Sequence, residues 1–343
     1  MLGLLAPELV DDVHLRAMVE VLVEFPVPRR PRAGGAQDGA VEKPVGHGCT
    51  ILSHRQAWGE PRGSDSGSDF VDSYSGGVNK DVQMRVATWC IGGVRGHLKV
   101  LCHWLERRRP DVVALQKISV SEEKFPTGEL LDAGYRSVPL RRRSLYGVAV
   151  LSRIVGPALE VQDRGLAGND GRDDGLLTAR VGDLLVYCVY APYGNPSERG
   201  IDGALAHKIA WLDRLRAHLE ERKTASEPSL LCGDFNILPD VPAKKRVLNC
   251  TPEEKERFQE LLNAGFVDLH RRVNPPSDQG LNYGFNTREP PTSRLQLILG
   301  NECVAKSVAS VCVDLKYRAP INALVGKTWP TSAPMIADLT HSF

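Results

Sequence analysis

Short apolar segments of strand length alternate with longer amphipathic segments from residue 84 to residue 343. Segment 84–90 alternates as a half-buried strand does, and segment 111–116 is a continuous apolar run typical of a buried strand. This alternation predicts an α/β fold in which helices cover large sheets. Further strands are expected at 147–152, 184–190, 229–233, 294–299 and 335–339, and helices at 96–109, 204–223 and 251–264.

Residues 1–83 differ in composition and are predicted to be an N-terminal extension, an arm ahead of one folded domain at 84–343. The arm holds 12 Asp and Glu against 8 Lys and Arg. Apolar residues recur at three- and four-residue steps over 7–25, which predicts an amphipathic helix. The later stretches 29–48 and 63–77 are rich in Pro, Gly and Ser and predict a flexible segment. The helix either packs on its own domain or docks on a partner.

Charge and hydropathy exclude several classes of protein. The net charge is only +1, so nucleic-acid binding would need a local basic patch. No stretch approaches the roughly 18 apolar residues of a membrane span. The acids near the start are untypical of a secretory signal or an organelle presequence. The eight cysteines form no CxxC pair, which predicts buried free thiols in a reducing, intracellular compartment.

Seven segments occur in an order that is recognisable as a set. The first is MRVATWCIGGVR at 84–95, and the others follow it along the domain. They are RPDVVALQK (109–117), GVAVLSR (147–153), VYAPYGN (189–195), KIAWLDRL (208–215), CGDFNI (232–237) and TPEE (251–254).

Together these segments resemble the exonuclease III branch of the endonuclease/exonuclease/phosphatase superfamily. The resemblance implies a four-layer α/β sandwich, with two facing mixed β-sheets flanked by helices. It also implies cleavage of DNA at abasic sites and at 3′ ends with Mg²⁺. That chemistry needs oxygen ligands for the metal, a carboxylate that activates water, and groups that stabilise the phosphoryl oxygens.

Three positions keep the residues that the resemblance assigns to the active site. Asp234 and Asn236 stand for the water-activating Asp and the phosphate-contacting Asn, and Tyr190 keeps the Tyr of the fourth motif. Because their partners are substituted, Asp234 and Asn236 are also compatible with a purely structural hydrogen-bond network at the end of a strand.

Five positions depart from the family pattern. Cys90 replaces an Asn beside the metal, and Lys117 replaces the Glu that is the main metal ligand. Gln296 replaces an Asp, and Thr331 and Ser332 replace an Asp-His pair. A thiol is a poor Mg²⁺ ligand, and an ammonium group repels the ion.

The substitutions add four units of positive charge and leave one carboxylate of the family's four. We therefore expect no metal and no other cofactor. Lys117 is expected where the metal would lie, paired with Asp234. Arg141, Arg142 and Arg143 form the best candidate for a phosphate-binding patch, and the same three residues could equally dock a protein.

The first function indicated is that of a catalytically inactive, exonuclease III-like protein, acting as a structural or docking subunit of a larger assembly. Its partners would be protein subunits bound through the N-terminal arm, with a mitochondrial complex as one setting. Binding of nucleic acid is not favoured as the main role. The alternative is a Mg²⁺-dependent DNA-repair nuclease with weak or altered activity, which would restore the metal.

Overall fold

The computed structural model describes residues 82–141, 147–167, 175–193, 196–222, 227–245, 247–284, 291–315, 317 and 330–343. Residues 1–81 of the arm, including the helix expected at 7–25, lie outside the described residues, as do Arg142 and Arg143. Among the described helices, none is long and apolar enough to cross a membrane.

The first of two six-stranded sheets has the strand order β11-β12-β1-β2-β4-β3. Strands β1 and β2 are parallel, and the other neighbours are antiparallel, so the sheet is mixed. The bounds are β1 (Met84–Cys90), β2 (Val112–Gln116), β3 (Tyr135–Leu140), β4 (Val148–Arg153), β11 (Val308–Val313) and β12 (Met335–Leu339).

The second sheet has the order β5-β6-β7-β8-β10-β9 and is mixed as well, with β7 and β8 as its parallel pair. The remaining pairs are antiparallel. The bounds are β5 (Leu159–Arg164), β6 (Leu176–Val181), β7 (Leu184–Tyr190), β8 (Ser229–Asp234), β9 (Phe266–Asp268) and β10 (Gln296–Asn301).

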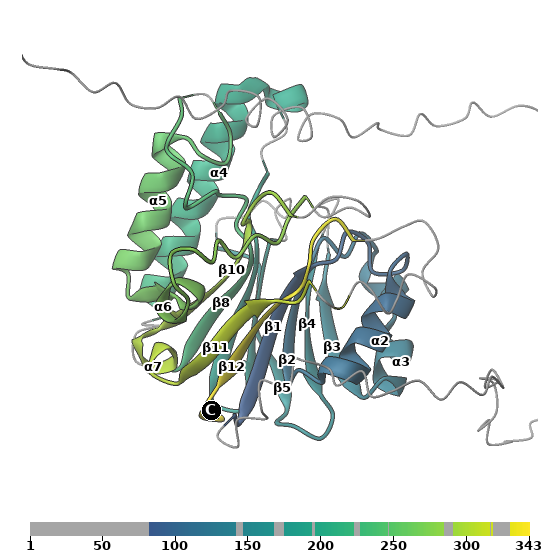
Figure 1. Cartoon of the computed structure of the whole chain (residues 1–343). Coiled ribbons are helices and arrows are strands. Elements are labelled where there is room, and N and C mark those ends of the chain that lie inside the picture. The colour runs from purple at the N-terminus through teal and green to yellow at the C-terminus, as the bar shows by residue number, and fades with distance from the viewer. Residues whose placement is uncertain are drawn as a thin grey trace, which may run out of the picture. The chain divides into compact units, whose positions relative to one another are not determined.

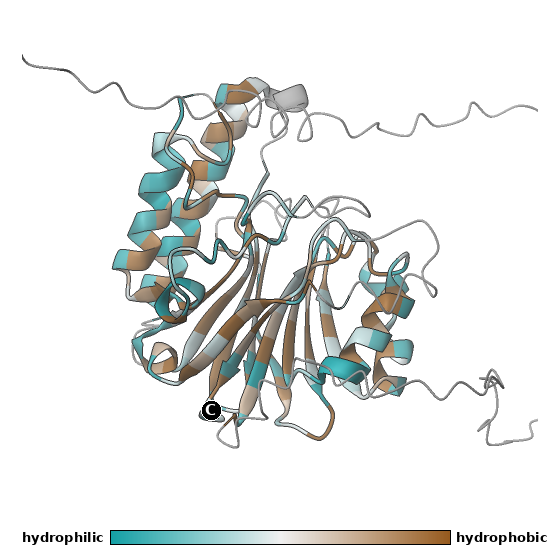
Figure 2. Ribbon diagram, viewed as in Figure 1, coloured by the Kyte–Doolittle hydropathy of each residue, from teal (hydrophilic) through white to brown (hydrophobic). Residues whose placement is uncertain are grey.

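The helices lie on the outer faces of the two sheets, and Figure 1 shows α2 and α3 beside the first sheet and α4 and α5 beside the second. The helices α2, α3, α4 and α5 carry both hydrophilic and hydrophobic residues, whereas the strands are mainly hydrophobic (Figure 2). The bounds are α2 (Leu98–Arg108), α3 (Thr127–Asp132), α4 (Pro196–Glu221), α5 (Pro252–Asn263), α6 (Leu269–Val273) and α7 (Glu302–Ala305).

Three apolar clusters hold these layers together. One fills the space between the sheets and includes Val86, Val186 and Ile298. A second packs the first sheet on α2 through residues such as Trp104, and a third packs the second sheet on α4 and α5 through residues such as Trp211. The four-layer α/β sandwich expected from the resemblance is therefore confirmed.

Most of the expected elements are present with small shifts at their ends. The helix expected at 204–223 begins earlier, at Pro196, because two helical pieces join across a kink at Gly200, where φ is 66°. The edge strands β3, β5, β9 and β11 were not expected, nor was β6, which lies inside the second sheet. Two of them, β5 and β11, show mixed burial without clear alternation, so their periodicity is weak.

The seven cysteines within the described ranges are free thiols. Cys90, Cys188, Cys232 and Cys250 are buried, as expected, and burial raises the pKa of the Cys188 thiol to about 12. Cys303 is exposed, which the sequence did not predict because the residue lies in the short helix α7, which was not foreseen.

Candidate functional site

The candidate site lies where several strands of the two sheets end or begin. Cys90 closes β1, and Lys117 follows β2 directly. In the second sheet, Tyr190 and Asp234 are register neighbours at the ends of β7 and β8, and Gln296 pairs with Asp234 at the start of β10. Residues far apart in the sequence are therefore gathered at one end of the sandwich.

Asp234 is the buried carboxylate of this site, with only 2% of its surface exposed. Burial raises its pKa from 3.8 to about 6, because the charged form is poorly solvated. The main-chain N–H of Asn236, the thiol of Cys90 and the positive charges of Lys117 and Lys208 limit the rise. The carboxylate therefore has polar neighbours on several sides.

The turn after β8 explains why Asp234 has this orientation. An added Cβ at Gly233 would lie 1.8 Å from the carbonyl oxygen of Val189, so only glycine lets the two parallel strands approach there. Asn236 adopts a left-handed conformation with φ 49°. Its main-chain N–H donates to Asp234 Oδ1 at 3.0 Å, and its side-chain amide donates to the Ala191 carbonyl at 2.8 Å.

Lys117 enters the site from a left-handed turn, with φ 55°. Its carbonyl accepts a hydrogen bond from the N–H of Gly93 at 2.8 Å, which ties the turn to the loop after β1. Lys117 is half-buried, and its positive charge lies close enough to oppose the rise in the pKa values of both Asp234 and Cys90. The structure thus brings Lys117 together with Asp234.

Cys90 is buried against the same carboxylate. Its thiol donates to Asp234, and burial together with that negative charge raises the pKa of the thiol well above its usual value. A thiol with a raised pKa stays protonated and is a weak nucleophile and a weak metal ligand. Cys90 is therefore a hydrogen-bond donor in this site.

Gln296 bonds across the two sheets. Its side-chain carbonyl accepts from the main-chain N–H of Cys90 at 2.6 Å, and its Nε2 donates to the carbonyl of Ala333 at 3.1 Å. The side chain is fully buried. An amide satisfies both partners because it offers one acceptor and one donor, whereas a carboxylate would face the Ala333 carbonyl with a second acceptor.

The two hydroxyl residues are also engaged. Ser332 Oγ donates to the Cys90 carbonyl at 2.6 Å, and the Ser332 carbonyl accepts from Trp89 Nε1 at 2.9 Å. A hydrogen bond joins the hydroxyl groups of Thr331 and Tyr283. Ser332 therefore fixes the chain before β12 rather than serving as a nucleophile.

Tyr283 belongs to the site, although it is not among the site residues expected from the sequence. Burial and the nearby groups of Cys90 and Asp234 raise the pKa of its hydroxyl. Its main chain bridges to both Ser293 and Ser332, so the segment is held on two sides. In the sequence, Asn282 and Tyr283 precede a glycine, and this pattern gave no sign that Tyr283 would lie in the site.

A fully buried ion pair supports the turn that holds Asp234. Lys208 Nζ donates to Glu254 Oε1 at 2.6 Å, to Asn249 Oδ1 at 3.2 Å and to the carbonyl of Asn236. Burial lowers the pKa of Lys208, and Glu254 opposes that shift. Glu254 in turn closes the capping box of α5 with Thr251.

Two features of the sequence point to this ion pair, although neither of them indicates a role for it in the site. Lys208 lies within the apolar stripe of its helix, four residues after Ala204 and three before Trp211, and such a lysine needs a buried partner. Glu254 stands three residues after Thr251, the spacing of a capping box. Together, Lys208 and Glu254 hold the turn that carries Asn236, next to Asp234.

Arg141 is the described member of the expected arginine patch. It follows β3, and its main-chain N–H donates to Glu122 Oε1 at 3.3 Å.

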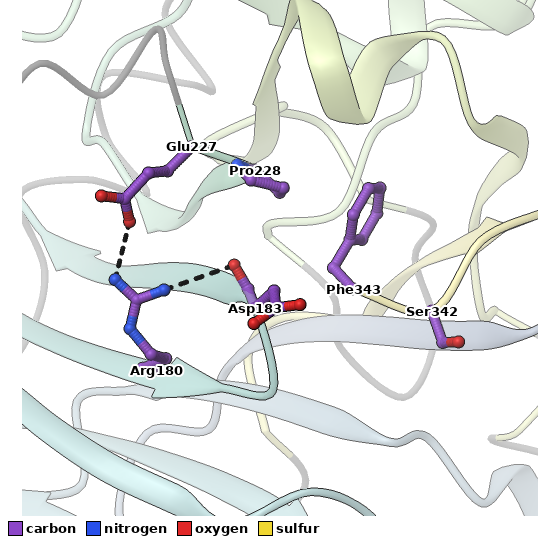
Figure 3. A pocket seen from close by; sticks show the side chains of 6 residues that line it. All are labelled: Arg180, Asp183, Glu227, Pro228, Ser342 and Phe343. Atoms are coloured by element: carbon purple, nitrogen blue, oxygen red, sulfur yellow. Dashed lines mark hydrogen bonds and ion pairs between the residues drawn. The ribbon is translucent and has the colours of Figure 1, made fainter.

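A separate open cavity of about 520 Å³ contains none of the expected site residues; it is lined by Arg180, Asp183, Glu227, Pro228, Ser342 and Phe343 (Figure 3).

The residues present do not fit a magnesium ion. Asp234 is the one carboxylate among the eight expected pocket residues, and an amine, a thiol and a bonded amide surround it. Across the described ranges, no group of three or more His, Cys, Asp or Glu side chains is placed to hold a metal. Mg²⁺ requires several oxygen ligands, usually including carboxylates.

Comparison with known proteins agrees with this architecture. A family model described as the endonuclease/exonuclease/phosphatase family matches residues 91–318. Exodeoxyribonuclease III of Haemophilus influenzae is 27% identical over 258 residues, which cover 70% of this chain and 95% of the relative. DNA repair nuclease APEX1 of Danio rerio is 24% identical over 271 residues, covering 75% of this chain and 84% of the relative.

Solved structures show the same fold. The structure of an AP endonuclease from Archaeoglobus fulgidus matches with a TM-score of 0.64 and 22% identity, over 75% of this chain and 99% of that chain. At this level of identity the likeness concerns the arrangement of sheets and helices alone.

Proposed function

Because the chain belongs to the endonuclease/exonuclease/phosphatase family, with exonuclease III-like relatives, we propose that it keeps the family's fold without metal-dependent hydrolysis. In this proposal the chain is a structural or docking subunit of a larger assembly. The pocket then contributes to the stability of the sandwich, and the binding surfaces lie elsewhere on the molecule.

One observation carries this proposal, namely the use of the pocket's polar groups for internal bonding. Gln296 is bonded to Cys90 and Ala333, and Ser332 is bonded to Cys90. Phosphoryl transfer with a metal needs oxygen atoms that remain available to the ion and to the phosphate. Here these positions connect strands to each other, and Lys117 places a positive charge beside Asp234.

The direct test is an assay of purified full-length protein on a duplex that contains one abasic site, with Mg²⁺ and with Mn²⁺. The proposal predicts the same cleavage for the wild type and for Asp234→Ala, at the level of the buffer alone. Metal-dependent cleavage that Asp234→Ala abolishes would establish the nuclease and overturn the proposal.

The docking role has its own test. The tagged chain, isolated from its own cells, is expected to co-purify with defined protein subunits in one large particle. A variant that lacks residues 1–30 is expected to be lost from that particle if the arm is the attachment. A monomer in both forms would contradict the docking role.

The second candidate is a weak or altered DNA-repair nuclease. Its specific support is the intact segment at 233–236 with Asp234 and Asn236, together with relatives that are named an exodeoxyribonuclease and a DNA repair nuclease. A carboxyl with a pKa of about 6 could accept a proton at neutral pH. Under this reading Mg²⁺ would bind, and the abasic-site assay separates the two candidates.

A further inference from the structure

A second surface of interest lies at the end of the first sheet opposite the pocket. Strand β2 begins there at Val112, whose antiparallel partner is Ser152 near the end of β4. In the sequence, α2 ends a few residues before β2 begins, and α3 ends a few residues before β3 begins. We use the name far-edge patch for Arg109, Leu131, Arg136, Arg153 and Val155.

Hydrogen bonds show that the patch is contiguous. Arg136 Nη1 donates to the carbonyl of Arg153 at 3.3 Å. The N–H of Ile154 donates to the Gly134 carbonyl at 2.9 Å, and the N–H of Gly134 donates to the Leu131 carbonyl at 2.9 Å. These bonds connect the end of α3, the start of β3 and the turn that follows β4.

Arg109 reaches the same place from α2. It caps that helix in a left-handed conformation, with φ 49°. The hydroxyl of the buried Tyr135 donates to the Pro110 carbonyl at 2.8 Å. Burial raises the pKa of that hydroxyl, and the positive charges of Arg109 and Arg153 both oppose the rise, so both residues lie near it.

The aliphatic members of the patch are exposed to an unusual degree. Val155 is 82% exposed and Leu131 is 52% exposed, the two highest values among the large apolar side chains of the described residues. Single exposed apolar residues are common on protein surfaces. Here two of them lie in one connected edge with three arginines.

The patch is also positive. Arg153 pairs with Asp111 at 3.0 Å, whereas neither Arg109 nor Arg136 forms an ion pair with a described residue. The exposed Asp132 follows Leu131. Even with this acid included, the three guanidinium groups outnumber the carboxylates. The nearby exposed Glu106 and Arg107 cancel in charge.

We propose that the far-edge patch is a docking surface for an acidic, aliphatic-rich segment of a partner protein. The proposal rests on the docking role proposed above and names the surface and the chemistry of its partner. Arginine is enriched at protein interfaces, and the buried centre of an interface is more apolar than the rest of the protein surface. A surface for single-stranded nucleic acid typically offers aromatic side chains for base stacking, and the one aromatic residue here, Tyr135, is buried.

The test places a photoreactive p-benzoylphenylalanine at position 155 of the full-length chain, expressed in its own cells. Illumination is expected to give one main crosslinked protein, in which the attached peptide is rich in Asp, Glu and aliphatic residues. The double variant Arg109→Glu/Arg136→Glu is expected to lower the crosslink yield at least tenfold. The milder Arg109→Gln/Arg136→Gln is expected to lower it less.

Controls separate docking from folding. The photoreactive residue at Val273, which is 36% exposed on α6, is expected to give no such product. Thermal melts are expected to change little in the charge variants, since Arg109 and Arg136 are exposed and the variants remove a single exposed side-chain hydrogen bond.

Three results would overturn the proposal: crosslinks to nucleic acid or to a second copy, absence of a protein crosslink at 155, or a yield unaffected by charge reversal. Each is distinguishable from failure of the docking role itself, which co-purification of the tagged chain reports separately.

Discussion

The side-chain carbonyl of Gln296 accepts a hydrogen bond from the main-chain N–H of Cys90 at 2.6 Å and so joins the two sheets at the pocket. The same amide donates to the carbonyl of Ala333. The resemblance implies a metal-site carboxylate at position 296. Here the residue at this position forms structural hydrogen bonds instead. This change of use is the main support for the proposal that the pocket is non-catalytic.

Gln296→Glu tests whether the amide is required. The new carboxylate keeps the shape of the side chain but opposes the Ala333 carbonyl, so we expect a loss of roughly 3 kcal/mol in the free energy of unfolding at pH 7, measured with urea. The loss should shrink at acid pH, where a protonated Glu can donate. The exposed Gln259→Glu serves as control, with a change below about 0.5 kcal/mol. An equally small change for Gln296→Glu would contradict the assigned role.

Asp234 should give the protein an unusual dependence of stability on pH. Its pKa is about 6 in the fold and near 3.8 when unfolded, so the folded state holds an extra proton between these values. Stability from this group is full below pH 4 and is lost as the pH rises through 6, by about 3 kcal/mol. Relative to wild type, Asp234→Asn should therefore gain stability over this range. Urea titrations at several pH values measure the difference.

The exposed Asp183→Asn is the matched control and should show no such trend. If the difference in the free energy of unfolding between wild type and Asp234→Asn stays constant from pH 4 to pH 6.5, the pKa of the Asp234 carboxyl is not raised in the fold.

Lys117→Met tests the cation that lies beside Asp234. Removing a positive charge disfavours the carboxylate, so the pKa of Asp234 should rise above about 6. A ¹³C NMR titration of the Asp234 carboxyl carbon measures the value directly. Lys99→Met, at an exposed position on α2, should leave it unchanged. If the pKa of Asp234 is the same in Lys117→Met as in the wild type, Lys117 does not act on this carboxyl.

Lys208→Met should be among the most destabilising single changes in the domain. It leaves the buried Glu254 charge without its partner and deprives the Asn236 carbonyl of a donor. We expect a cost of about 3–5 kcal/mol in urea unfolding. The double variant Lys208→Met/Glu254→Gln should recover part of the loss, and the exposed Lys245→Met should cost little. No recovery in the double variant would indicate that the ion pair is not the cause.

The sequence predicted the sandwich well because its central strands are long apolar runs and its motifs are collinear. Met84–Cys90, Leu184–Tyr190 and Met335–Leu339 have the expected bounds. Edge strands such as β5 were missed because solvent on one side weakens their pattern.

The site was predictable at the positions that the motifs name and was not predictable in its bonding. The sequence showed that Gln296 and Ser332 replace acidic and basic groups, but their new partners, Ala333 and the Cys90 carbonyl, depend on how the chain before β12 crosses the sheets. Tyr283 was missed for the same reason, since only the tertiary fold brings it to Asp234.

Binding of Mn²⁺ to the purified full-length chain tests the central claim most directly, because Mn²⁺ takes the same ligands as Mg²⁺ and is visible by electron paramagnetic resonance. The account predicts that a titration at neutral pH finds no site with a Kd below about 1 mM that depends on Asp234. A tighter single site in the wild type that disappears in Asp234→Ala would contradict it and identify a working metal centre.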